Sequence, residues 1–123
     1  MSAQRTQSEM DSECPSDVFD RAHLSHYTMH NADLEREIIG LFVSQLGSTI
    51  TMIETAQTAA DWKLYTHTLR GSAAAIGARR LLAIAVELET LGFKGDRQIR
   101  GLRLQSLQAA AIEFRQAVKH IHP

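Results

Sequence analysis

The stretch YTHTLRGSAAAIGARRL, residues 65–81, contains the end of one helical segment and the start of the next. Apolar residues recur at helical spacing both before and after Gly77. Glycine commonly ends a helix because it adopts left-handed backbone angles without steric strain. We therefore predict one helix from about Ala60 to Ile76 and another from Ala78 to Leu91, where Gly92 opens the turn-rich sequence GFKGD.

Hydrophobic periodicity predicts three further helices. A short helix covers roughly residues 17–27, with Ser16 as its N-cap, and a long one follows Asn31 or Asp33, which are both favourable N-cap residues. The last helix begins near Asp96. The two long segments repeat apolar residues three and four positions apart: Leu34, Ile38, Ile39, Leu41, Phe42, Leu46 and Ile53 in the first, and Leu104, Leu107, Ala111, Phe114, Val118 and Ile121 in the second.

No segment has the alternating pattern of a β-strand. The sequence therefore predicts an all-α fold, an antiparallel four-helix bundle with a short extra N-terminal helix. Residues 1–15 are polar and lack hydrophobic periodicity. We predict that they form a flexible N-terminal tail and that residues 16–123 form a single domain.

Composition narrows the class of function. The chain has 123 residues, 44% of them hydrophobic, which suits one compact domain. Thirteen basic and fourteen acidic residues give a net charge of −1, so no basic excess points to nucleic acid or to an anionic membrane. No apolar run approaches the roughly 18–20 residues of a membrane span, and the polar start is unlike a signal peptide. The single cysteine, Cys14, excludes an intramolecular disulfide, and we expect a cytoplasmic protein.

His67 is predicted to point away from the core. At about 100° per residue, the apolar side chains of its helix fall within about 80° of one another, and His67 lies about 160° from their centre. These core-facing side chains are Trp62, Tyr65, Leu69, Ala73 and Ile76. The side of the helix that His67 occupies also carries Gly71, Ala74 and Ala78, and it is flanked by Lys63 and Arg70.

An exposed imidazole beside a glycine can act as a nucleophile that is accessible to another protein. Neutral imidazole keeps a ring-nitrogen lone pair near neutral pH, and it can attack phosphorus to form a phosphoimidazole that readily passes the group on. Gly71 would leave room for the active site of another protein, and the nearby cations could position a phosphoryl group. Spacing alone leaves two alternatives open, an ordinary surface histidine and an Ala/Gly run that packs against another helix.

The segment HTLRGSAAAIGARRLLAIAVELE, residues 67–89, resembles the signature of histidine-containing phosphotransfer (HPt) domains. That signature has a histidine, a basic residue three positions later, a glycine and a run of small residues, then a Gly-Ala pair, a leucine and a closing Leu-Glu. The matching residues here are His67, Arg70, Gly71, Ser72, Gly77, Ala78, Leu81, Leu88 and Glu89. The segment LEREIIGLFVSQL also resembles the preceding helix of the family.

The resemblance implies a role for each of these positions. His67 would be the phosphoacceptor, and Arg70, where lysine is commoner, would hold the phosphoryl group or the acidic pocket of a receiver domain. Gly71 would keep the approach clear. Glu89 would accept a hydrogen bond from one ring nitrogen and leave the other free to attack, and a carboxylate there should favour the protonated imidazole. A surrounding partner-binding surface would include Lys63, Ala74 and Ala78.

The function implied by the resemblance is that of a phosphorelay intermediate. His67 would accept a phosphoryl group from a receiver-domain aspartate and pass it to another receiver, of a response regulator or a hybrid histidine kinase. Such a protein is a phosphocarrier rather than an independent enzyme. It needs no cofactor of its own, because Mg²⁺ belongs to the receiver and no ATP is bound, and the sequence has no P-loop motif. We expect a monomer.

Two other functions stay open. One is a degenerate HPt-like module that binds receivers without phosphotransfer, and the other is the dimerising phosphoacceptor domain of a histidine kinase. His23, His26 and His30 have spacings that could suggest a metal site, but the predicted helix ends near Tyr27 and no carboxylate or cysteine completes a ligand set. We therefore expect no metal site.

Overall fold

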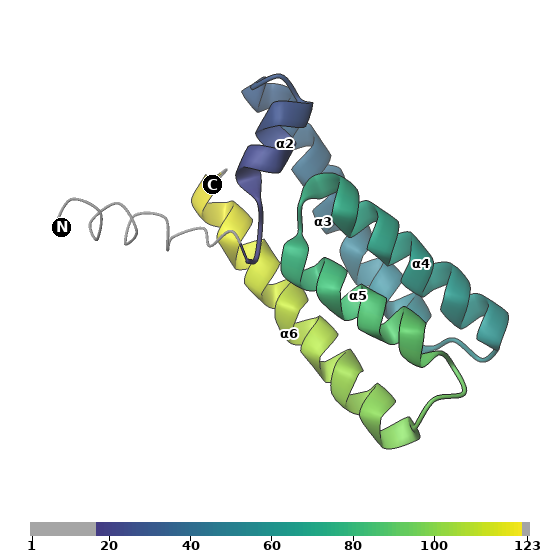
Figure 1. Ribbon diagram of the computed structural model, residues 1–123. Helices are drawn as coiled ribbons and strands as arrows, with labels where there is room; N and C mark the ends of the chain where they lie inside the picture. The colour runs from purple at the N-terminus through teal and green to yellow at the C-terminus, as the bar shows by residue number, and fades with distance from the viewer. Residues whose placement is uncertain (1–16, 122–123) are drawn as a thin grey trace, which may run out of the picture.

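The computed structural model describes residues 17–121, which contain five α-helices and no strand. The helices are α2 (Arg21–Tyr27), α3 (Ala32–Glu54), α4 (Ala59–Ile76), α5 (Arg79–Leu91) and α6 (Arg97–Ile121). The four long helices run side by side, and α2 lies at one end of the bundle (Figure 1). Helix α3 packs on α4, α4 on α5, α5 on α6 and α6 back on α3. The predicted four-helix bundle with a short N-terminal helix is confirmed.

Three of the long helices have an N-cap residue whose side chain accepts a backbone hydrogen bond. The side chain of Asn31 accepts a hydrogen bond from the Leu34 N–H, and that of Thr58 accepts one from the Asp61 N–H. The Asp96 carboxylate accepts from the N–H groups of the second and third residues of α6. Each cap satisfies backbone donors that have no partner within the helix. Asn31 and Asp96 match the predicted starts of α3 and α6, whereas Thr58 is a cap that the sequence analysis does not name.

The predicted start of the first helix is wrong. Residues 17–20 are not helical, and α2 begins at Arg21 with Asp20 as its N-cap. The reason is packing, because Val18 and Phe19 are both buried in the core and the chain turns to place them there. Ser16, the predicted cap, lies outside the described residues, as does the predicted N-terminal tail.

The core lies between the four long helices. Trp62, Leu69, Ala73 and Ile76 of α4 are buried as predicted, and Tyr65 is partly buried. Two apolar residues of α3, Leu34 and Leu41, are exposed instead. The largest fully buried side chains are Phe19, Phe114, Leu24, Leu46, Ile53, Leu69, Leu81, Leu88, Leu107 and Thr66.

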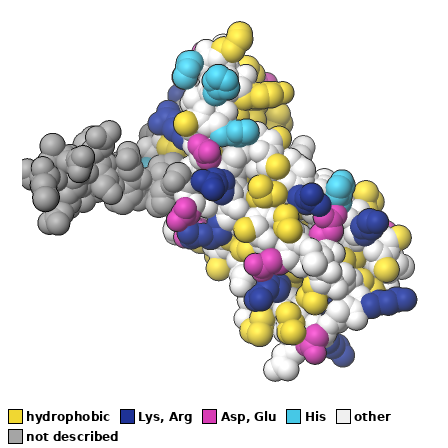
Figure 2. Space-filling model, viewed as in Figure 1, with side chains coloured by type: hydrophobic (Ala, Val, Ile, Leu, Met, Phe, Trp, Pro, Cys, Tyr) yellow, Lys and Arg dark blue, Asp and Glu magenta, His cyan; other side chains and the backbone are white. Residues whose placement is uncertain are grey.

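The surface carries charges of both signs. Figure 2 shows positive, negative and apolar side chains mixed over one face of the bundle, without a continuous basic patch on the part that residues 17–121 form. Within that range no helix is long and apolar enough to cross a membrane.

Candidate functional site

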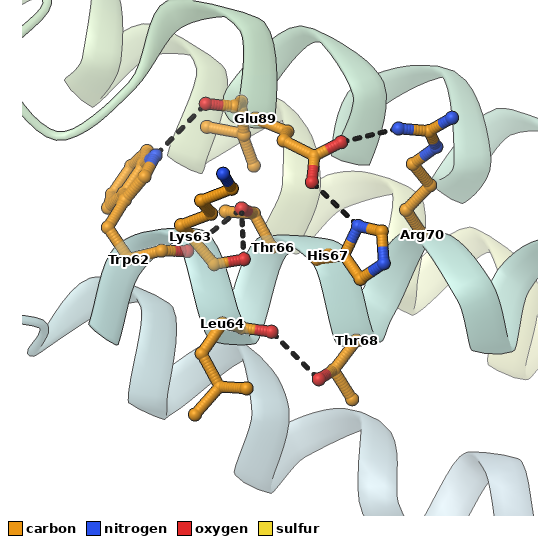
Figure 3. A network of polar contacts seen from close by, with 9 residues as sticks. Trp62, Lys63, Leu64, Thr66, His67, Thr68, Arg70 and Glu89 are labelled. Carbon is orange, nitrogen blue, oxygen red and sulfur yellow. Dashed lines mark hydrogen bonds and ion pairs between the residues drawn. The ribbon is translucent and has the colours of Figure 1, made fainter. Parts of the chain in front are cut away.

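The site is built on two neighbouring helices, α4 and α5. His67 and Arg70 lie one turn apart on α4, and Glu89 lies on α5. The indole Nε1 of Trp62 donates a buried hydrogen bond of 3.0 Å to the carbonyl oxygen of Leu88, the residue before Glu89 (Figure 3). This buried bond ties α4 to α5 one residue before Glu89, and it supports the helix packing that places Glu89 opposite His67.

The Glu89 carboxylate bridges the two side chains of α4. Its Oε2 lies 2.8 Å from Nδ1 of His67, and its Oε1 accepts a 2.6 Å hydrogen bond from Nη1 of Arg70 (Figure 3). The Glu89 side chain is only 16% exposed, whereas that of His67 is 69% exposed. The carboxylate is therefore sheltered between its partners, while the ring faces solvent.

The network determines which ring nitrogen is free. The hydrogen bond from Arg70, and secondly the one from His67, hold the pKa of Glu89 below its ordinary value, so this carboxyl group is ionised at neutral pH. An ionised carboxylate can only accept hydrogen bonds. The proton of the neutral imidazole must therefore lie on Nδ1, which leaves Nε2 with its lone pair on the side of the ring away from Glu89 (Figure 3).

These contacts add little to the stability of the fold. An ion pair in which one partner is largely exposed contributes little, because solvent screens it and ordering the side chains costs entropy. The His67 and Arg70 side chains are 69% and 49% exposed. The network is better suited to orienting the imidazole than to holding the bundle together.

The chain is similar to a known family of protein domains. A family model described as the Hpt domain matches residues 37–119, which is more than half of the chain. The chain belongs to the Hpt domain family. Hpt domains act in histidine phosphotransfer within phosphorelays and interact with receiver domains of two-component systems. No curated protein and no solved structure is similar enough to the chain to count as a match.

The surface of this Hpt domain around His67 is open, with one correction to the sequence prediction. Gly71, Ala74 and Lys63 are exposed, and apart from its own stretch of helix no atom of residues 17–121 would lie within 4 Å of a Cβ at residue 71. Ala78, predicted to share this surface, is completely buried. The prediction for Ala78 assumed that the 100° helical period continues to residue 78. Helix α4 instead ends at Ile76, and the left-handed Gly77 changes the direction of the chain before Ala78. Its side chain therefore cannot contact a partner.

Sequence reasoning missed two features that support the site. The prediction assigned Trp62 to the core but did not identify its bond to Leu88, although a buried indole N–H requires an acceptor. Thr66, the residue before His67, is also fully buried, and its hydroxyl donates to the carbonyl oxygen of Trp62 at 2.8 Å. A threonine can enter a helical core in this way because its hydroxyl bonds within its own helix.

The three histidines in and just after α2 show no such organisation within the described residues. His23, His26 and His30 are exposed at and after α2. Residues 17–121 contain no group of three His, Cys, Asp or Glu side chains that could hold a metal ion. Cys14 lies outside that range.

Proposed function

We propose that His67 is the phosphoacceptor of this Hpt domain and that it carries phosphoryl groups between the aspartates of two receiver domains. The observation that carries the proposal is the contact between Nδ1 and Glu89, because it leaves Nε2 as the exposed nucleophilic nitrogen. The open surface formed by Gly71, Ala74 and Lys63 supports the approach of a folded partner.

The chemistry needs no proton transfer to or from the ring. The Nε2 lone pair forms the N–P bond while the P–O bond to the donor aspartate breaks, and the released electron pair stays on the aspartate carboxylate. Nδ1 keeps its proton, so the phosphorylated ring carries a positive charge opposite the ionised Glu89. In the second transfer a carboxylate oxygen of the acceptor receiver's aspartate forms a P–O bond while the N–P bond breaks, the electron pair of that bond returns to Nε2, and neutral imidazole leaves.

We expect the receiver domain to supply the metal ion that the transfer needs. We expect the receiver to bind the Mg²⁺ that neutralises the phosphoryl oxygens, while this chain supplies the nucleophile and a docking surface. On this proposal the protein acts as a monomeric phosphocarrier in the cytoplasm, without a cofactor or an ATP site of its own.

The test is transfer of labelled phosphate from a phosphorylated receiver. We expect the wild-type chain to gain phosphate that is labile in acid and stable in base, as a phosphoimidazole is, and a second receiver to remove it. His67→Gln should gain none, while His120→Gln, a change of another exposed histidine, should behave as wild type. Undiminished receiver binding without any transfer to the wild-type chain would instead indicate a binding module, and acid-labile phosphate on His67→Gln would show that the assignment is wrong.

A further inference from the structure

Lys63 is an exposed cation on the face of α4 that carries His67. The two residues are four positions apart, so they are neighbours on the helix surface. Figure 3 shows Lys63 and Arg70 on either side of His67 along α4. Within residues 17–121 the ammonium group of Lys63 forms no hydrogen bond or ion pair. Its positive charge is therefore left to solvent, one turn before the exposed imidazole.

The other charges beside this face are compensated within the fold. Three ion pairs join α5 to its neighbours: Arg70–Glu89, Arg103–Glu87 and Arg80–Glu113. They include both acidic residues of α5, so neither is left to neutralise Lys63. Asp61 precedes Lys63 by two positions, a spacing at which helical side chains do not face each other. Lys63 therefore adds an uncompensated positive charge at the rim of the site.

A receiver domain brings the opposite charge to this rim. On the proposed function it carries the aspartate that bears the phosphoryl group, and it binds Mg²⁺, which proteins hold mainly through carboxylates and phosphate oxygens. The face that docks on His67 is therefore acidic. A lysine suits such a face, because its ammonium group is a compact charge on a flexible stem and can meet a carboxylate in more than one geometry.

We propose that Lys63 is a recognition residue that draws the acidic face of a receiver domain to His67, through an ion pair with a carboxylate at the rim of the receiver's site. The inference deepens the proposed function by naming the partner chemistry, and it rests on that function. Lys63 keeps its proton throughout and takes no part in making or breaking the N–P and P–O bonds. Its contribution is to association of the two proteins.

This role predicts a specific kinetic pattern, because a charge at the rim of an interface acts mainly on the association rate and its salt dependence. The quantity to measure is the second-order rate constant of transfer from a phosphorylated receiver, well below saturation and at low ionic strength. Lys63→Gln should lower this constant by about three- to tenfold and Lys63→Glu by more, whereas Lys63→Arg should keep it within about twofold of wild type.

Salt and saturation distinguish steering from a part in the chemical step. At about 1 M salt, where the Debye length is about 3 Å, Lys63→Gln should transfer as fast as wild type. At saturating receiver its maximal rate should also equal that of wild type. A wild-type rate constant for Lys63→Gln at low salt would overturn the inference. A loss that salt does not remove, or a lowered maximal rate, would overturn it as well.

Lys119 provides the matched control. It is an exposed lysine in the last turn of α6, a helix that does not pack against α4. Lys119→Gln makes the same change in net charge and should leave the rate constant at its wild-type value. Equal losses in Lys119→Gln and Lys63→Gln would mean that association follows the total charge of the chain and not the position of Lys63, which contradicts the inference.

A binding measurement separates this inference from the assignment of the phosphoacceptor. Stopped-flow mixing of a fluorescently labelled, Mg²⁺-loaded receiver domain with the His67→Gln chain measures association without any transfer. Adding Lys63→Gln to that chain should slow association at low salt by the same factor as it slows transfer, since the ion pair does not involve His67. Equal association rates would overturn the role of Lys63 and leave the assignment of His67 intact. A slower rate would support Lys63 even if His67 proved not to accept phosphate.

Discussion

Gly71 lies in the middle of α4, where a glycine weakens the helix. It costs about 0.5–1 kcal/mol relative to alanine, because the unfolded glycine backbone has more freedom to lose. No turn or close contact within the described part of the chain explains it, since a Cβ at this position would meet no atom there within 4 Å outside its own helical turn. The free space above Gly71 is open to solvent next to His67, which is consistent with a surface kept clear for a partner.

We therefore predict opposite effects of Gly71→Ala on stability and on phosphotransfer. The free energy of unfolding should rise by about 0.5–1 kcal/mol, because the helix gains a better former and no atom is displaced. The rate of transfer from a phosphorylated receiver should fall several-fold, because the methyl group enters the space left for the partner. Urea denaturation followed by Trp62 fluorescence measures the first quantity, and single-turnover label transfer measures the second.

Gly101 on α6 provides the matched control. It is also helical and exposed, and a Cβ there would likewise meet none of the described residues beyond its own helical turn within 4 Å. Gly101→Ala should give the same gain in stability with wild-type transfer. If Gly71→Ala transferred phosphate as fast as Gly101→Ala, the open surface at residue 71 would not be needed for docking.

At the scale of elements, the end of α4 fixes how the neighbouring segments are attached. Gly77 has a left-handed backbone with φ of 87°, and its carbonyl oxygen accepts a 2.7 Å hydrogen bond from the N–H of Asp20. A Cβ at residue 77 would lie 2.8 Å from the backbone oxygen of Asp20. The glycine thus ends α4, turns the chain into α5 and leaves room for the segment that leads into α2.

Gly77→Ala should therefore destabilise the protein, in contrast to the same change six residues earlier. The left-handed backbone alone costs an alanine about 1–2 kcal/mol, and the contact with Asp20 adds to it because backbone atoms must move. We expect the free energy of unfolding to fall by more than that amount in urea denaturation.

Gly92→Ala tests backbone strain without the contact to Asp20. Gly92, at the end of α5, has φ of 77° and ψ of 165°, a backbone region that is essentially restricted to glycine, and no atom of the described residues beyond its own neighbours would lie within 4 Å of a Cβ there. We expect backbone strain alone to lower the free energy of unfolding by about 1–3 kcal/mol in the same urea denaturation. A loss below about 1 kcal/mol would mean that the turn after α5 relaxes to accommodate the alanine.

A buried carboxylate on α3 also attaches helix α2 to the bundle. Glu35 in the first turn of α3 is only 3% exposed, and its Oε1 accepts a 3.1 Å hydrogen bond from Nε of Arg21 on α2. From the sequence, an acidic residue at this position suits the positive end of the helix dipole. Its additional use as an anchor for α2 depends on where the two helices meet, which no local pattern contains.

For the whole molecule, Phe114 joins three distant parts of the chain. Its ring lies 5.5 Å from that of Phe19 and 5.2 Å from that of Phe42, in edge-to-face arrangements. These contacts link α6 with α3 and with the segment before α2. Such pairs add about 0.5–1.5 kcal/mol to the gain from burying apolar area, so this cluster is a main source of stability for the bundle.

Phe114→Ala should lower the free energy of unfolding by about 3–5 kcal/mol, because it removes a fully buried ring and leaves a cavity. Phe114→Leu, which keeps much of the volume, should cost less. Trp62, which is buried and the single tryptophan of the chain, reports unfolding in both. A loss below about 1 kcal/mol for the alanine variant would show that the core collapses around the missing ring.

The sequence by itself determined the helices, the bundle and the outward direction of His67. Caps and hydrophobic periods act within one or two turns, so residues such as Asn31 and Gly77 specify boundaries locally. The same local reasoning failed at residues 17–20, where burial of Val18 and Phe19 overrides the helical pattern, and at Ala78, where the helix has already ended.

Only the tertiary structure determined which side chains of the site form hydrogen bonds with one another. The resemblance to the family pointed to a bond between Glu89 and the imidazole, but it left Arg70 to a phosphoryl group or a partner. The two contacts of Glu89 span 22 and 19 residues of chain, so they depend on the packing of α4 against α5, which the Trp62–Leu88 bond supports. That packing brings Arg70 and His67 to one carboxylate, since contacts over such separations arise from how helices dock and not from the pattern along either helix.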